Sequence, residues 1–315
     1  MENNILYNIS VFVIGIIILY FGGEGLVKGA SRLARSLGVN SILVGLTVVA
    51  FGTSAPELVV SIIASLKGSN DLIVGNILGS NISNIGLILA TAALIYSIRI
   101  KLTLIKVELP FMIMLSLLLF VLSKDLLIQR SEGVVLFALL TSIIIYSCYD
   151  AFKEPKHIER EFDEFLEADK NYFKNSLYIV FGLVGLSVGA KLLVDSAISI
   201  AQDLGVSEAI IGISAVAIGT SLPELTTSVI AALKKESGII IGNIIGSNIF
   251  NIGILGIVSV IKPIEIEQSL LNFEFVIMIL FSIALLPIMR TGFKITKTEG
   301  TLLLLFYLMF LRFIF

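Results

Sequence analysis

Residues 45–68 read GLTVVAFGTSAPELVVSIIASLKG, and residues 212–235 read GISAVAIGTSLPELTTSVIAALKK. The second stretch lies 167 residues after the first, and the same offset relates the GSNI string at 79–82 to the one at 246–249. Between residues 22 and 86, about half of the positions match their partner at this offset. Self-similarity of this length without a gap indicates an internal duplication.

The composition places this duplicated chain in a membrane. Of its 315 residues, 57% are hydrophobic and only 15% are charged, and the mean hydropathy is +1.01. Water-soluble domains carry about 25% charged residues. The 22 basic and 24 acidic residues nearly balance, so the chain lacks the basic surface that nucleic acid binding requires. One cysteine, Cys148, and one histidine, His157, exclude an internal disulfide and an imidazole metal cage.

A transmembrane helix needs about 20 mostly apolar residues, and this length predicts ten spans. They cover residues 5–21, 41–66, 72–96, 107–122, 133–148, 176–194, 209–233, 238–261, 271–289 and 301–315. The duplication divides them into a first half, residues 1–149, and a second half, residues 176–315, joined by residues 150–175.

Each half holds five predicted spans, and an odd number inserts the second half in the opposite orientation. We therefore predict an all-α membrane protein of ten transmembrane helices, arranged as two inverted five-helix repeats. Inverted repeats are typical of secondary transporters, which bind their substrates between the repeats near the membrane midplane.

The basic residues predict the orientation of the bundle. Of the 22 Lys and Arg residues, 16 fall in connections on one side. Because basic connections stay in the cytoplasm, we predict a multi-pass protein of the cell membrane with both termini outside. The linker 150–175 then lies inside, and its apolar residues at helical spacing favour an amphipathic segment on the membrane surface. A regulatory ion-sensing segment is the alternative.

Two glutamates, Glu57 and Glu224, are the only ionisable residues deep within the predicted spans, and they are partners in the duplication. A charge at the centre of such a helix costs about 2.5–3.5 kcal/mol on insertion scales. A pair at matching depth therefore indicates function. Polar residues share a helix face with each glutamate: Ala50, Thr53, Ser54 and Glu57 in the first half, and Ala217, Thr220, Ser221 and Glu224 in the second.

Proline precedes each glutamate, as Pro56 and Pro223. Because proline lacks an N–H and its ring clashes with the carbonyl four residues earlier, we predict that the helices break there and turn carbonyl oxygens inward. A second polar stripe with a period of four residues follows on the next span of each half. Its members are Asn76, Ser80 and Asn84, and Asn243, Ser247 and Asn251. We predict broken helices in spans two, three, seven and eight around a midplane site.

Two further features of these spans are interpreted as packing elements. Asn81 and Asn248 lie beside the polar stripe rather than on it, and we expect them to be helix-packing amides. The pairs Gly75–Gly79 and Gly242–Gly246 have the spacing that lets helices approach closely, which we favour over direct ion contact.

Together the two faces and stripes offer two carboxylates surrounded by hydroxyl, amide and carbonyl oxygens. Hard cations such as Ca²⁺ and Na⁺ prefer these ligands, whereas transition metals favour thiolate or imidazole. Two carboxylates are neutralised equally by one Ca²⁺ or by two Na⁺, so the two ions compete for one set of oxygens. We expect these ions as transported substrates and expect no cofactor.

The strings GTSAPE at 52–57 and GTSLPE at 219–224, each followed by GNI(L/I)GSNI(S/F)NIG, closely resemble the paired repeats of the sodium/calcium exchanger family. This family belongs to the wider calcium/cation antiporters, and the chain resembles a prokaryotic ten-helix member. The resemblance implies a reversible Na⁺/Ca²⁺ antiporter that works by alternating access. It also implies that the first and sixth helices, near residues 5–35 and 176–201, slide across the remaining bundle.

The resemblance further implies a ligand set. The calcium position corresponds to Glu57 and Glu224 with oxygens from Thr53 and Thr220. One sodium position corresponds to the Ala50 carbonyl, Ser54 and Ser247, and the other to the Ala217 carbonyl, Ser221 and Ser80. Some members carry an aspartate at the position of Asn84 or Asn251, and the amides here argue against potassium dependence.

Other functions stay open at this point. A Ca²⁺/H⁺ exchanger, or an exchanger of another divalent cation, is the main alternative. A cation channel would use the same acidic pair, but channels commonly assemble such residues into rings by oligomeric symmetry. An enzyme with two facing carboxylates is disfavoured by the surplus of neutral oxygen ligands. We expect a monomer that contacts the lipid bilayer and no nucleic acid.

Overall fold

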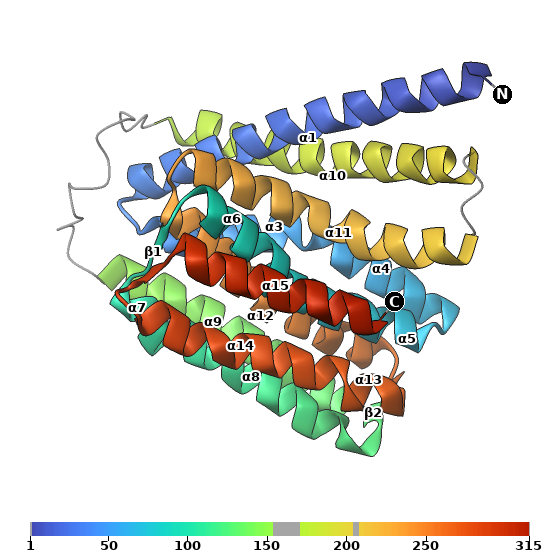
Figure 1. Ribbon diagram of the computed structural model, residues 1–315. Helices are drawn as coiled ribbons and strands as arrows, with labels where there is room; N and C mark the ends of the chain where they lie inside the picture. Colours follow the sequence, from blue (N-terminus) through green and yellow to red (C-terminus); the bar gives the residue numbers. More distant parts are fainter. Residues whose placement is uncertain (1, 154–170, 204–207, 315) are drawn as a thin grey trace.

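The computed structural model describes residues 2–153, 171–203 and 208–314 (Figure 1). It describes the side chains of these residues except 2–5, 152–153, 201, 203 and 208–218. Most of the predicted linker 150–175 therefore lies outside the described residues.

The first half contains ten helical elements before residue 123, with short strands and a long helix towards its end. These elements are α1 (Glu2–Leu37), α2 (Ser41–Val44), η1 (Gly45–Val49), α3 (Ala50–Thr53), α4 (Ala55–Lys67), α5 (Asn70–Ser83), η2 (Asn84–Leu89), α6 (Ala90–Ile95), β1 (Ile98–Arg99), α7 (Leu102–Lys106), α8 (Glu108–Leu122), η3 (Ser123–Asp125), β2 (Leu127–Ile128) and α9 (Arg130–Lys153). The segments η1 and η2 are π-helical.

The second half has fewer and longer helices. Its elements are α10 (Tyr172–Asp203), α11 (Glu208–Leu233), α12 (Ser237–Ile261), β3 (Ile264–Glu265), α13 (Gln268–Asn272), α14 (Glu274–Arg290), β4 (Lys294–Ile295) and α15 (Lys297–Ile314).

Seven helices in the described part of the chain are long and apolar enough to cross a membrane. They are Leu6–Leu37, Asn70–Ile95, Leu102–Asp125, Arg130–Ala151, Tyr172–Ile200, Ser237–Ile261 and Gln268–Arg290. The pair Ser41–Thr53 and Ala55–Lys67, bent by 41°, makes an eighth when it is counted as one span. The predicted spans 209–233 and 301–315 are also helical, as α11 and α15. The chain is thus a helical membrane protein, while ten crossings in two inverted repeats stay a prediction.

Helix α12 occupies the centre of the bundle, and nearly all of its residues are buried. Helices α1 and α10 lie side by side along one edge (Figure 1). Glycine permits their close approach: a Cβ at Gly182 would lie 2.5 Å from the Leu26 nitrogen, and one at Gly22 would lie 2.7 Å from the Leu186 nitrogen. Backbone-to-backbone packing of this kind is a common way for membrane helices to associate.

Two short antiparallel ribbons join the halves. Strand β1 pairs with β4, with Ile98 opposite Ile295, and β2 pairs with β3, with Ile128 opposite Ile264. Each ribbon takes one strand from each half. Strands β1 and β2 lie at opposite ends of the bundle (Figure 1).

The predicted helix breaks are confirmed at only one place. Span two breaks at Ser54, and Pro56 falls in the first turn of α4, where a missing N–H leaves no hydrogen bond unmade. The predicted break in span seven is wrong, because α11 runs continuously through Pro223. Neighbouring helices allow proline inside membrane helices by satisfying the backbone groups that it frees. Spans three and eight are also continuous, and span three instead contains the π-helical turn η2.

Candidate cation site between the two halves

The two deep glutamates come together in the interior. Glu57 lies in the first turn of α4 and Glu224 lies in α11, and each residue is 1% exposed. Their carboxyl groups are close enough to interact electrostatically. The hydroxyl of Ser54, at the break before α4, donates a hydrogen bond to Oε1 of Glu224 at 3.2 Å. The acidic residues of both halves therefore share one buried site.

The surrounding hydroxyls reach the carboxylates across the two halves. Thr220 and Ser80 lie within hydrogen-bonding reach of Glu57. Thr53 and Ser54 lie within reach of Glu224. Each carboxylate thus has a threonine of the other half close by, although each threonine shares a helix face with the glutamate of its own half.

Several oxygens in this site have no hydrogen-bond partner among the described residues. They are Oε2 of Glu57, Oε2 of Glu224, Oδ1 of Asn84, Oδ1 of Asn251, Oγ of Ser221 and Oγ of Ser247. Buried acceptors are rarely left unpaired, because each one loses its hydration without compensation. A cation bound among them supplies that compensation, and an all-oxygen set suits a hard cation. In the described part of the chain, no three His, Cys, Asp or Glu side chains lie together so that they could hold a metal ion. Neutral oxygens would therefore have to complete the coordination shell of an ion at the glutamate pair.

A second layer of asparagine and serine holds the two threonines. Thr53 donates to Oδ1 of Asn243 at 3.1 Å, and Thr220 donates to Oδ1 of Asn76 at 3.3 Å. The asparagine amides in turn donate to serines of their own halves: Asn243 to Ser228 at 3.3 Å, and Asn76 to Ser61 at 3.4 Å. Sequence reasoning placed the asparagines on the polar stripe but missed both serines. Their signal was present, since 61 and 228 differ by the duplication offset of 167.

The two predicted backbone ligands are described to different degrees. The carbonyl of Ala50 accepts hydrogen bonds from the Ser54 nitrogen at 2.9 Å and from the Thr53 hydroxyl at 3.4 Å. The Ala50 carbonyl therefore already has two hydrogen-bond donors within the helix. Ala217 lies inside α11, and its side chain is outside those described.

The glycine pairs were expected to allow close packing. A Cβ at Gly242 would lie 2.5 Å from the Ile42 oxygen, and one at Gly246 would lie 2.5 Å from the Leu46 oxygen, so close packing is confirmed there. At the duplication offset, the residues that would face Gly75 and Gly79 fall within 208–218, whose side chains lie outside those described. Packing of this first pair therefore stays a prediction.

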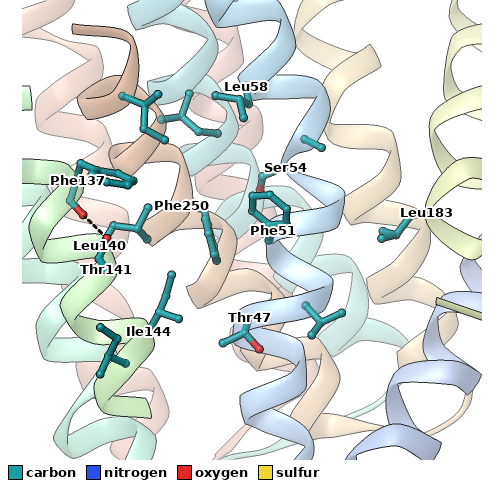
Figure 2. Close-up of a pocket in the computed structure, with 15 residues that line it drawn as sticks. Thr47, Phe51, Ser54, Leu58, Phe137, Leu140, Thr141, Ile144, Leu183 and Phe250 are labelled. Atoms are coloured by element: carbon teal, nitrogen blue, oxygen red, sulfur yellow. Dashed lines mark hydrogen bonds between the residues drawn. The ribbon is translucent and has the colours of Figure 1, made fainter. Parts of the chain in front are cut away.

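An apolar cavity of about 580 Å³ reaches the site from another direction. Figure 2 shows Phe51 and Phe250 facing each other in this cavity, near Ser54. Their ring centroids are 5.6 Å apart. The remaining walls are mostly apolar and include Leu140 and Ile144 of α9, Leu183 of α10 and Ile254 of α12. This lining favours hydrocarbon over hydrated ions, so the cavity is a poor ion route.

Comparison with known proteins connects this geometry to a family. The model of the family described as "Sodium/calcium exchanger protein" matches residues 7–149 and 174–315. The chain is 36% identical over 306 residues to "Putative antiporter CaxA" of Alkalimonas amylolytica, covering 95% of this chain and 96% of the relative. It is 32% identical over 344 residues to "Sodium/calcium exchanger MaX1" of Methanosarcina acetivorans, covering 96% and 97%.

Solved structures give the same result. The sodium-calcium exchanger NCX_Mj, soaked with 2.5 mM Na⁺ and 10 mM Sr²⁺, superposes with a TM-score of 0.86 at 31% identity, covering 98% of this chain and 99% of that one. The same exchanger soaked without Na⁺ and Ca²⁺ gives a TM-score of 0.87. Since the family match and the relatives cover both halves, including the buried glutamates, the chain belongs to the sodium/calcium exchanger family.

Proposed function

We propose that this membrane exchanger moves Na⁺ against Ca²⁺ through the site between Glu57 and Glu224. The observation that carries the proposal is the buried pair of carboxylates from opposite halves, each with one oxygen that lacks a partner in the described structure. The family is one of transporters rather than enzymes, and Na⁺ and Ca²⁺ fit it as transported ions.

The charge of the site supports competition between the two ions. Two ionised carboxylates are balanced by one Ca²⁺ or by two Na⁺, and a third Na⁺ would make the exchange electrogenic. We assign Ca²⁺ to Glu57 and Glu224 with oxygens of Thr53 and Thr220. The sodium ligands are then Ser54, Ser247 and the Ala50 carbonyl on one side, and Ser80, Ser221 and the Ala217 carbonyl on the other, with Asn84 and Asn251 between them.

The transport cycle requires a defined orientation and two access states. We propose ten crossings in two inverted halves, 1–149 and 176–315, in the cell membrane. Both termini then face outward, the linker 150–175 faces the cytoplasm, and the working unit is the monomer. Alternating access would expose the glutamate pair to one side at a time.

Flux measurements on proteoliposomes test the proposal. Vesicles loaded with Na⁺ and diluted into Na⁺-free buffer should accumulate radioactive calcium, and a clamped membrane potential should show whether charge moves. Calcium uptake that ignores Na⁺ but follows a pH gradient would instead assign the chain to Ca²⁺/H⁺ exchange.

Variants of the glutamates link the flux to the site. Glu57→Gln and Glu224→Gln should each abolish exchange while leaving a folded protein, because each removes one of the two charges that balance Ca²⁺. Glu265→Gln, at an exposed glutamate in β3, is the matched control and should keep wild-type flux. Exchange at the wild-type rate in either site variant would contradict the assignment.

A further inference from the structure

Four asparagines form a buried cluster where α5 and η2 meet α12. Asn81, Asn84, Asn248 and Asn251 are exposed by 2% or less. Asn84 and Asn251 lie on the polar stripe of the candidate site. Asn81 and Asn248 lie beside it and were expected to serve helix packing only.

The hydrogen bonds of this cluster cross between the two halves. Asn84 donates from Nδ2 to Oδ1 of Asn248 at 3.3 Å. Asn251 donates from Nδ2 to Oδ1 of Asn81 at 3.0 Å. At the duplication offset of 167, Asn84 corresponds to Asn251 and Asn81 corresponds to Asn248. The two hydrogen bonds are therefore equivalent in the two halves. A pattern kept in both halves points to a shared role.

These bonds decide which end of each amide faces the ions. An asparagine side chain has an NH₂ donor at one end and an oxygen acceptor at the other. Because the NH₂ groups of Asn84 and Asn251 donate hydrogen bonds within the cluster, the Oδ1 atoms of these two residues stay available to a cation. Both oxygens are buried and have no partner among the described residues. The opposite orientation would present NH₂ groups to a cation and repel it.

Two methionines hold the outer asparagines in turn. Asn248 donates from Nδ2 to Sδ of Met112 in α8 at 3.6 Å. Asn81 donates to Sδ of Met278 in α14 at 3.6 Å and to the backbone oxygen of Asn248 at 3.4 Å. Both methionines are fully buried. With their own NH₂ groups directed to these acceptors, Asn81 and Asn248 must turn their oxygens towards the amides of the inner pair.

We infer that Asn81 and Asn248 are positioning residues, each of which orients the inner asparagine of the opposite half so that its oxygen faces the cation. This inference rests on the proposed function, and it adds two residues that do not touch the ion. It makes the ion ligation by Asn84 depend on Asn248, and that by Asn251 depend on Asn81.

A double-mutant cycle separates positioning from packing. Asn248→Leu, Asn84→Ala and the double variant are prepared as full-length protein, and Ca²⁺ binding is measured by calorimetry in detergent. Each single change should weaken binding by about 10- to 100-fold, the usual effect of removing a residue that supports a metal ligand. The double variant should bind no more weakly than Asn84→Ala, because Asn248 acts through Asn84 alone.

The melting temperature of the ion-free protein supplies the readout for packing. A packing role would lower the melting temperature and would add its effect on binding to that of Asn84→Ala. Additive losses, or unchanged binding in Asn248→Leu, would overturn the inference. Asn175→Leu, which removes a buried amide on α10 away from the cluster, is the control and should leave Ca²⁺ binding unchanged.

The second half of the cluster gives an independent cycle if Asn248→Leu does not fold. Asn81→Leu, Asn251→Ala and their combination should show the same lack of additivity. If the wild-type protein binds Ca²⁺ but the losses of affinity are additive in both cycles, the positioning role is contradicted and the exchanger assignment stays intact. If wild-type protein bound neither Ca²⁺ nor Na⁺, the proposed function would fail and the positioning role with it.

Discussion

The hydroxyl of Ser54 donates to Oε1 of Glu224 across the boundary between the two halves, at 3.2 Å. Ser54 sits at the break between α3 and α4, and Glu224 lies within the continuous helix α11. The bent helix of one half thus delivers a hydroxyl to the carboxylate of the other.

Removing this hydroxyl should weaken Na⁺ binding more than Ca²⁺ binding. Ser54→Ala takes away the donor to Glu224 and one proposed sodium ligand, while both carboxylates remain. We expect the Na⁺ concentration for half-maximal exchange to rise by about tenfold, which corresponds to 1.4 kcal/mol. Calcium uptake measured over a range of internal Na⁺ concentrations tests this. Ser142→Ala removes a hydroxyl bonded to the Leu139 carbonyl on α9 and should leave the Na⁺ dependence unchanged.

The asparagines of the second layer should matter as much as direct ligands. Asn243→Leu removes the asparagine acceptor of the Thr53 hydroxyl, and Asn76→Leu removes that of the Thr220 hydroxyl. Loss of such support typically weakens ion binding by about 10- to 100-fold. Calorimetric titration with Ca²⁺ is the measurement. Equal affinities in both variants and wild type would show that the threonines need no support.

Bulk at Gly246 should destabilise the protein. A Cβ at this position would already lie 2.5 Å from the Leu46 oxygen, so Gly246→Leu would force α12 away from η1. We expect a strongly lowered melting temperature in detergent. A melting temperature near that of the wild type would contradict the close packing of α12.

The two prolines should differ in their effects on stability. An interior proline costs about 3 kcal/mol in an ordinary helix, whereas the first turn tolerates it. Pro223→Ala should therefore raise the melting temperature in detergent, and Pro56→Ala should change it little. A larger gain from Pro56→Ala would show that α4 does not begin where the structure places it.

The sequence was sufficient to predict the residues that meet at the site, because the duplication marks them twice. Glu57 and Glu224, with the threonines and serines on their helix faces, share matching depth and matching neighbours. A polar residue on one helix face is weak evidence alone, but the same residue repeated at a fixed offset in a membrane span is strong evidence. The helical class was predicted separately, from the high mean hydropathy and the length of the apolar segments.

The differences between the halves were not predictable, because they depend on tertiary packing. The two prolines occupy equivalent positions, yet only the helix that contains Pro56 breaks. The orientation of the Asn81 and Asn248 amides also depends on Met278 of α14 and Met112 of α8, which are far from these asparagines in the sequence.

The β1–β4 and β2–β3 ribbons have a consequence for how the helices are attached. They pair the two halves at both ends of the bundle. Helices α1 and α10 adjoin neither ribbon, and glycines let their backbones approach closely. Helix α1 is instead attached to the second half by side chains, among them the ion pair between Arg35 and Glu236.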